Sequence, residues 1–75
     1  MKALIETIVR PLVDFPENIE VTEEETEHKI RYHLTVHESD VGKVIGKNGR
    51  IAKAIRTVVY AAGSDIKKKI YLDIM

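Results

Sequence analysis

The apolar positions in the first half of the chain change from a helical period to a strand period. Helical spacing links five residues, Leu4, Ile5, Ile8, Val9 and Leu12. This spacing predicts a helix over residues 2 to about 12, which Pro11 ends or bends. Strict alternation with polar residues then runs through Ile30, Tyr32, Leu34 and Val36. A period of two predicts a strand with one buried face, and a shorter alternation at Ile19 and Val21 predicts a partner strand before it.

An acidic segment, residues 22–28, separates these two strands and is expected to form the solvated turn of a hairpin. After the second strand, Ser39 or Asp40 can begin a short helix over residues 41–45. A longer helix is expected after the next pair of glycines, and Gly63 is expected to end it. Its apolar face is expected to consist of Ile51, Ala52, Ile55, Val58, Val59 and Ala62.

The last segment alternates again, with Ile70, Leu72 and Ile74 inward and Tyr71 and Asp73 outward, which predicts a third strand. The expected order is therefore helix, strand, strand, helix, helix, strand. This order predicts an α+β domain of two layers, in which a three-stranded sheet carries the helices on one face.

Length and composition limit the classes of protein that the chain can belong to. Its 75 residues are expected to form a single domain, residues 1–75, with a small core. It has no cysteine, which excludes disulfides and thiolate metal sites. The N-terminal segment carries Glu6 and Arg10 among its apolar residues, unlike a signal peptide, and no apolar run reaches the length of a membrane helix. A cytoplasmic protein that does not bind membranes is therefore expected.

Charge is divided unevenly along the chain. Residues 1–40 contain four Lys/Arg and ten Asp/Glu, whereas residues 41–75 contain eight Lys/Arg and two Asp/Glu. No acidic residue occurs from Lys43 to Ser64. The chain can therefore present a positive face to a polyanion while its net charge stays zero. Two oppositely charged faces that favour self-association, or that only stay solvated, explain the division equally well.

The segment Gly46–Gly49 between the two expected helices raises the question of phosphate binding. A nucleotide-binding P-loop needs four residues between its glycines and then Lys-Ser/Thr, but three residues separate Gly42 from Gly46, and Lys47-Asn48 follows. The Gly-x-Gly-x-x-Gly turn of dinucleotide-binding folds is absent too, and no strand leads into the segment. The spacing fits the Gly-x-x-Gly loop that clamps the backbone of about four nucleotides between two helices.

The string VGKVIGKNGRIAKAIR, residues 41–56, is more specific than its glycines alone. It resembles the signature of KH domains, in which Val-Ile-Gly-x-x-Gly joins two helices. The order of elements resembles the bacterial, type II version of that fold. The length of the chain and the strings VRPL, ESDVGKVIGKNGR and AIRTVVYAAG resemble the small stand-alone bacterial KH-domain proteins of the KhpA family. This resemblance covers nearly the whole chain and implies an RNA-binding protein.

The resemblance also implies a site around the glycine loop. The RNA backbone would be held by Gly46, Lys47, Asn48 and Gly49. A groove for bases would be floored by Val41, Val44 and Ile45. Further phosphate contacts are implied for Arg50, Lys53 and Lys43. The other wall of the groove would be the second strand near Leu34 to His37. For the three groove-floor residues, packing in the core is the alternative, and we expect it to hold for at least one of them.

The remaining polar residues do not predict catalysis. His28, His33 and His37 are best explained as solvent-facing residues, because His33 and His37 lie about 13 Å apart if they share a strand, too far for one metal ion. No carboxylate pair, nucleophile with a base, or cofactor motif occurs. The sequence therefore predicts no enzyme, no cofactor, no metal site and no small-molecule substrate.

Tyr60 falls with Arg56 away from the core face of the longer helix, and an exposed aromatic residue on a small domain favours an interface. A homodimer, or a heteromer with another KH-domain RNA-binding protein, is expected through a patch around Arg56, Val59 and Tyr60. The expected function is to hold short single-stranded RNA, as an RNA chaperone or post-transcriptional regulator. The alternative is a protein-interaction module whose basic loop binds an acidic protein partner.

Overall fold

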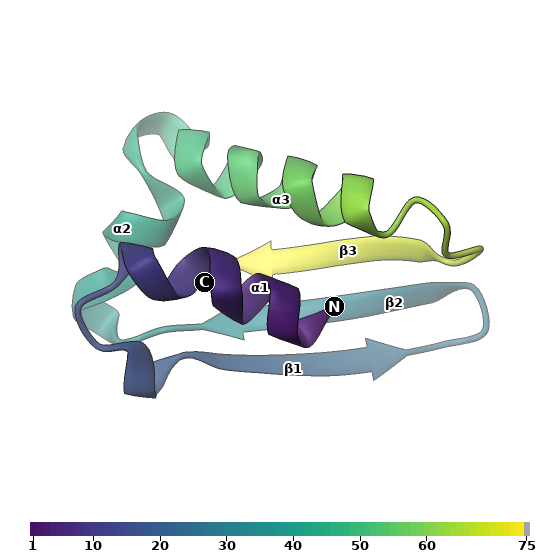
Figure 1. Cartoon of the computed structure of the whole chain (residues 1–75), viewed down its shortest axis with the longest axis horizontal. Coiled ribbons are helices and arrows are strands. Elements are labelled where there is room, and N and C mark those ends of the chain that lie inside the picture. Colours follow the sequence, from purple (N-terminus) through teal and green to yellow (C-terminus); the bar gives the residue numbers. More distant parts are fainter. Residues whose placement is uncertain (75) are drawn as a thin grey trace.

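The computed structural model describes residues 1–74 and has the order of elements that the sequence predicts (Figure 1). The helices are α1 (Lys2–Val9), α2 (Val41–Ile45) and α3 (Arg50–Ala62). The strands are β1 (Glu20–Glu25), β2 (Lys29–Thr35) and β3 (Lys69–Ile74). Short 3₁₀ turns include Arg10–Leu12 after α1 and Glu38–Asp40 before α2. Within residues 1–74, no helix is long and apolar enough to cross a membrane.

The three strands form one mixed sheet in the order β1-β2-β3. β1 pairs with β2 in the antiparallel direction, and β2 pairs with β3 in the parallel direction. Parallel neighbours require a long crossover, and the segment that contains α2 and α3 provides it. α1 lies across the sheet and α3 runs alongside β3, on the same face (Figure 1). The structure is therefore the two-layer α+β architecture that the sequence predicts.

The core lies between the sheet and the helices. On β2, Ile30, Tyr32 and Leu34 are buried while Arg31 and His33 are exposed, which confirms the alternation in the sequence. The helices and the third strand contribute fully or almost fully buried residues, namely Ile5, Val9, Val44, Ile55, Val59 and Leu72. Each such side chain stabilises the fold by about 1.5–3 kcal/mol relative to an exposed one.

The prediction that residues 22–28 form only a solvated turn is wrong. β1 extends to Glu25, and the glutamates at 23–25 pair with β2. The turn is closed by the N–H of Thr26, which donates to the C=O of Lys29 at 2.8 Å. Glutamates fit this strand because β1 is an edge strand, where exposed charge also discourages pairing with another chain.

The buried face of α3 is narrower than the sequence predicts. Three of the six predicted residues are buried, Ala52, Ile55 and Val59. The other three are exposed, Ile51, Val58 and Ala62. The buried residues follow one i, i+3, i+7 stripe, which is sufficient to seat the helix on the sheet. Two of the exposed residues, Ile51 and Val58, face α1, which covers them only partly.

Gly63 follows the last residue of α3 as predicted, but it does not have the conformation of a left-handed glycine cap. Its φ is −93°, outside the left-handed region that such a cap uses. A Cβ at this position would meet the end of the Ile70 side chain on β3, which would have to shift. Glycine therefore lets β3 pass close to the end of α3.

Candidate nucleic-acid interface

The loop Gly46–Gly49 turns the chain between α2 and α3 through three residues with positive φ. The φ angles are 74° at Gly46, 59° at Asn48 and 74° at Gly49. Few side chains tolerate the left-handed region, and asparagine is one of them. The N–H of Gly49 donates to the C=O of Gly46 at 3.2 Å and closes the turn. Each of the three positive φ angles in this loop therefore occurs at a residue type that tolerates it.

Gly46 is restricted by space as well as by conformation. Its ψ of 175° places it in a backbone region that essentially only glycine adopts. A Cβ on Gly46 would lie only 2.6 Å from Cγ1 of Ile51. Around Gly49, by contrast, a Cβ would meet open space. The loop is therefore packed against α3 at its first glycine and accessible at its last.

Basic side chains gather at the loop and the first turns of α3. Lys47, Arg50 and Lys53 are exposed, and none of them forms an ion pair with any of the residues that the structure describes. The first N–H groups of α3 have no partner within the helix and carry the positive end of its dipole. Together with the exposed Asn48, these groups form a surface suited to a phosphate backbone.

Lys43 does not share this surface, although the sequence groups it with the other lysines. Its Nζ forms an ion pair with Asp14 and a second with Asp40 at 3.5 Å. The hydrogen bond to Asp14 is the main cause that raises the pKa of Lys43 above its ordinary value. Because two carboxylates already neutralise Lys43, this structure does not offer it as a phosphate contact.

The apolar groove is smaller than the resemblance implies. Val44 is fully buried and belongs to the core, which is the alternative expected for at least one residue of the groove floor. Leu34 and Val36, on the expected opposite wall, are also buried. The residues that remain partly accessible to a base are Thr35, His37, Val41 and Ile45.

Asp40 has a structural role that the sequence does not indicate. The residue is fully buried and makes no capping hydrogen bond to α2. Its carboxylate accepts hydrogen bonds from the N–H groups of Asp14 at 3.1 Å and Phe15 at 3.0 Å. Burial alone would raise the pKa of Asp40, but these two donors and Lys43 lower it below the ordinary value of 3.8. Asp40 thus ties the connection after α1 to the start of α2, through partners too distant in sequence for a local pattern to indicate.

His37 takes part in the same junction and is not placed to bind a metal. Its ring stacks on Phe15 with the centroids 4.3 Å apart. Its Nδ1 accepts a hydrogen bond from the N–H of Ser39 at 3.0 Å, which caps the 3₁₀ turn before α2. His33 lies on β2 with its side chain exposed. Over residues 1–74, no group of three or more His, Asp or Glu side chains could hold a metal ion.

The patch predicted for self-association is largely occupied by contacts within the chain. Val59 is fully buried in the core and cannot contact another molecule. Arg56 Nε donates to the C=O of Leu72 at 3.0 Å, and the hydroxyl of Tyr60 accepts from the N–H of Leu72 at 3.3 Å. Because β3 is an edge strand, these two side chains satisfy backbone groups that β2 cannot reach. The prediction for Val59 is therefore wrong, and Arg56 and Tyr60 close the edge of the sheet.

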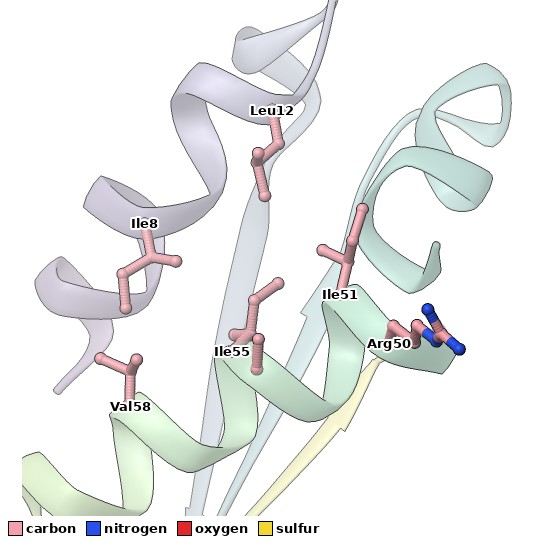
Figure 2. Close-up of a pocket in the computed structure, with 7 residues that line it drawn as sticks. Ile8, Leu12, Arg50, Ile51, Ile55 and Val58 are labelled. Carbon is pink, nitrogen blue, oxygen red and sulfur yellow. The ribbon is translucent and has the colours of Figure 1, made fainter. Parts of the chain in front are cut away.

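Exposed apolar side chains gather instead between α1 and α3. With the buried Ile55, the partly buried Ile8 and one basic residue, they line a hollow of about 360 Å³: Ile8, Leu12, Arg50, Ile51, Ala54, Ile55 and Val58. Figure 2 shows Ile51, Ile55 and Val58 in a row along α3, facing Ile8 and Leu12. Val58 is 49% exposed. Three of the large exposed apolar side chains, Leu12, Ile51 and Val58, therefore gather at this hollow.

The α-β-β-α-α-β order, the mixed sheet and the Gly-x-x-Gly loop between α2 and α3 define a type II KH domain. A family model described as KhpA/KhpB, KH domain, matches residues 2–74. The chain belongs to this KhpA/KhpB KH-domain family, as the resemblance of its loop and flanking helices implied.

Several relatives match over at least nine-tenths of their length. A protein of Oceanobacillus iheyensis named RNA-binding protein KhpA is 71% identical over 75 residues, which is 100% of both chains. The protein of the same name from Listeria monocytogenes is 57% identical over 75 residues, covering 100% of this chain and 99% of the relative. The one from Bacillus subtilis is 57% identical over 74 residues, covering 99% of this chain and 91% of the relative.

Proposed function

We propose that this protein binds short single-stranded RNA and catalyses no reaction. The RNA backbone lies against Gly46–Gly49, and Lys47, Arg50 and Lys53 contact its phosphates. The observation that carries the proposal is the combination, at one end of α3, of a loop with three positive φ angles and three exposed cations without ion pairs among residues 1–74. The names of the full-length relatives support RNA as the ligand. Such binding suits an RNA chaperone or a post-transcriptional regulator in the cytoplasm.

The test is the double substitution Lys47→Asp with Asn48→Asp. It changes the loop charge from +1 to −2 while both glycines stay in place, and aspartate tolerates the left-handed φ of position 48. A matched control, Lys67→Asp with Ser64→Asp, makes the same change in net charge at exposed positions beyond the other end of α3. Gel shift with single-stranded RNA and circular dichroism are measured on both. We expect the loop variant to lose RNA binding and the control to retain it, with both folded.

Unchanged RNA affinity in a folded loop variant would overturn the proposal. The alternative, in which the basic loop binds an acidic protein, predicts that wild type shows no salt-dependent binding to single-stranded RNA. Duplex DNA in the same assay measures the purely electrostatic background, because it offers phosphates without accessible bases. Binding to duplex DNA as tight as to single-stranded RNA would contradict the assignment of single strands as the ligand.

We also propose that the chain pairs with a second copy through the hollow between α1 and α3. Leu12 and Ile51 are each 36% exposed, and Val58 projects beside them. A net charge of zero removes long-range repulsion between copies. A two-fold arrangement uses the same patch twice, so that the exposed Val58 of each copy meets the hollow of the other. Two loops in one pair would reinforce each other on one RNA strand.

Sedimentation equilibrium over a wide range of concentration tests this pairing. Val58→Glu is expected to weaken self-association by at least about tenfold, because a charge would enter an apolar contact. Thr57→Glu, on the exposed face one residue away, is the matched control and is expected to leave it unchanged. A wild-type protein that stays monomeric at high concentration would refute the homodimer. Mixing with another KH-domain protein would then test the heteromer.

A further inference from the structure

We infer that Ile51 is a positioning residue for RNA binding, which holds the loop Gly46–Gly49 in its binding shape without contacting RNA. This inference rests on the proposed function of the loop. Helical spacing predicts Ile51 on the buried face of α3, but its side chain is 36% exposed and contributes little to the core. Its position is instead defined by the loop on one side and the hollow on the other.

The side chain of Ile51 occupies the space beside Gly46 in which a Cβ would lie. A Cβ built on Gly46 would lie 2.6 Å from Cγ1 and 2.9 Å from both Cβ and Cδ1 of Ile51. Three atoms of one side chain therefore fill the space that any other residue at position 46 would need. They also lie against the Cα of the residue whose φ of 74° and ψ of 175° start the turn.

Backbone hydrogen bonds also hold Gly46 in this conformation. Its N–H donates to the C=O of Gly42 at 2.8 Å, and its C=O accepts from the N–H of Gly49 at 3.2 Å. Glycine loses more backbone freedom on ordering than any other residue, so these bonds form against a large entropy cost and a side-chain contact adds to them. The branched Ile51 side chain, anchored on the first turn of α3, packs directly against this position. This contact thereby fixes the end of α2 relative to the start of α3.

The hollow gives a matched control for this role. Ile51 and Val58 both line it, both come from α3 and both are at least one-third exposed. Figure 2 places Val58 farther from the start of α3, opposite Ile8. Truncating either side chain removes a similar apolar group from the same surface, but only Ile51 lies against the loop.

The experiment compares Ile51→Ala, Ile51→Val and Val58→Ala. RNA affinity is measured by fluorescence anisotropy with a labelled single-stranded RNA, at protein concentrations where sedimentation shows the same association state for all variants. We expect Ile51→Ala to weaken binding about five- to tenfold, because the loop must then be ordered at the expense of binding energy. Val58→Ala is expected to stay within about twofold of wild type. Ile51→Val, which keeps the branched Cβ, is expected to lie between wild type and Ile51→Ala.

Two further readouts separate positioning from a direct contact or a general loss of structure. The slope of log affinity against log salt should not change in Ile51→Ala, because no phosphate contact is removed. Hydrogen exchange should become faster at the amide of Gly49, whose bond to Gly46 closes the turn, and not at the amides of β2.

Wild-type affinity in Ile51→Ala, or an equal loss in Val58→Ala, would overturn the inference. A shallower salt slope in Ile51→Ala would also contradict it. These outcomes differ from failure of the proposed function, which would appear as RNA binding by the Lys47→Asp, Asn48→Asp variant. If that variant loses RNA while Ile51→Ala does not, the loop binds RNA and only the positioning role is refuted.

Discussion

α2 is only five residues long, but the polar groups at its two ends have opposite environments. At the start, the buried carboxylate of Asp40 accepts two backbone N–H donors, and Lys43 is neutralised by Asp14 and Asp40. At the end, Gly46 opens a loop whose Lys47 forms no ion pair with any residue from 1 to 74. One end satisfies its polar groups within the chain, and the other presents them to solvent.

This difference separates residues that hold the fold from residues that are able to bind. Lys43 and Lys47 are the same residue type four positions apart in the sequence, and both are exposed. Only their partners differ. An anion that approaches Lys43 must compete with two carboxylates of the chain, whereas an anion that approaches Lys47 displaces only water. The candidate binding surface therefore consists of the cations that Asp14 and Asp40 do not neutralise.

The largest effect on stability is expected when Gly46, at the C-terminal end of α2, is substituted. Gly46→Ala combines a backbone region that alanine does not tolerate with a collision against Ile51, so we expect a loss of about 2–4 kcal/mol in unfolding free energy. In Gly49→Ala the new Cβ meets open space, and only the left-handed φ is unfavourable. The expected loss of unfolding free energy is therefore about 1–2 kcal/mol. Urea unfolding of both variants measures the difference, and equal losses would contradict the packing of Ile51 on Gly46.

At the N-terminal end of α2, Asp40→Asn is expected to lower stability at neutral pH. The substitution replaces a carboxylate that accepts from two backbone N–H groups with a neutral amide. The pKa of Asp40 is lowered in the folded state, so its contribution is complete above the unfolded value near 3.8. That contribution is lost as the pH falls through the folded pKa.

The measurement is urea unfolding of wild type and Asp40→Asn at neutral pH and at several pH values below 4. The two stability curves should converge as the pH falls, because protonated Asp40 and asparagine are both uncharged. A difference that stays constant down to the lowest pH would mean that the carboxylate charge is not what holds the junction.

A smaller effect of opposite sign is expected within α2 itself. A Cβ at Gly42 would meet no atom within 4 Å, and its φ lies outside the positive range. Gly42→Ala should therefore raise the unfolding free energy by about 0.4–1 kcal/mol, by reducing the freedom of the unfolded chain. Thermal unfolding of Gly42→Ala beside Gly46→Ala compares two glycines four residues apart, and destabilisation by both would show that α2 tolerates no side chain at either position.

The sequence alone was sufficient for the order of the elements because each has a clear period. The alternation along β2 and β3 and the bounds of α2 correspond closely to the structure. The errors arose where contacts between segments distant in the sequence determine the secondary structure or the burial of a residue. Glutamates are poor strand formers, and only the edge position of β1 makes their place in a strand favourable. Likewise, helical spacing placed Ile51 and Val58 with the core residues, because a wheel cannot show how much of α3 its neighbour α1 covers.

The candidate site was predictable to the extent that it is continuous in sequence. The glycine spacing and the basic run indicated Gly46 to Arg50 and Lys53 without structure. Lys43 and Asp40 lie three residues apart, but their partners Asp14 and Phe15 lie 25 to 29 residues away in the chain, so no local pattern could show the whole junction. Arg56 and Tyr60 were correctly placed off the core face of α3. Their hydrogen bonds to Leu72, however, depend on β3 being an edge strand, which the linear order does not reveal.

The smallest effect, and the most direct comparison of the two ends of α2, is expected from single lysine substitutions. Each phosphate contact on a single strand adds about −0.7 to the slope of log affinity against log salt, so three cations predict a wild-type slope of roughly −1.5 to −3. Lys47→Ala should bring this slope closer to zero by about 0.7 and weaken RNA binding about three- to fivefold. Lys43→Ala should leave the slope unchanged and affinity within about twofold, because Lys43 is already neutralised by its two ion pairs.

Anisotropy titrations at several salt concentrations give both quantities. Equal changes for the two lysines would mean that RNA draws Lys43 away from Asp14, and a wild-type slope near zero would mean that RNA does not bind the basic surface.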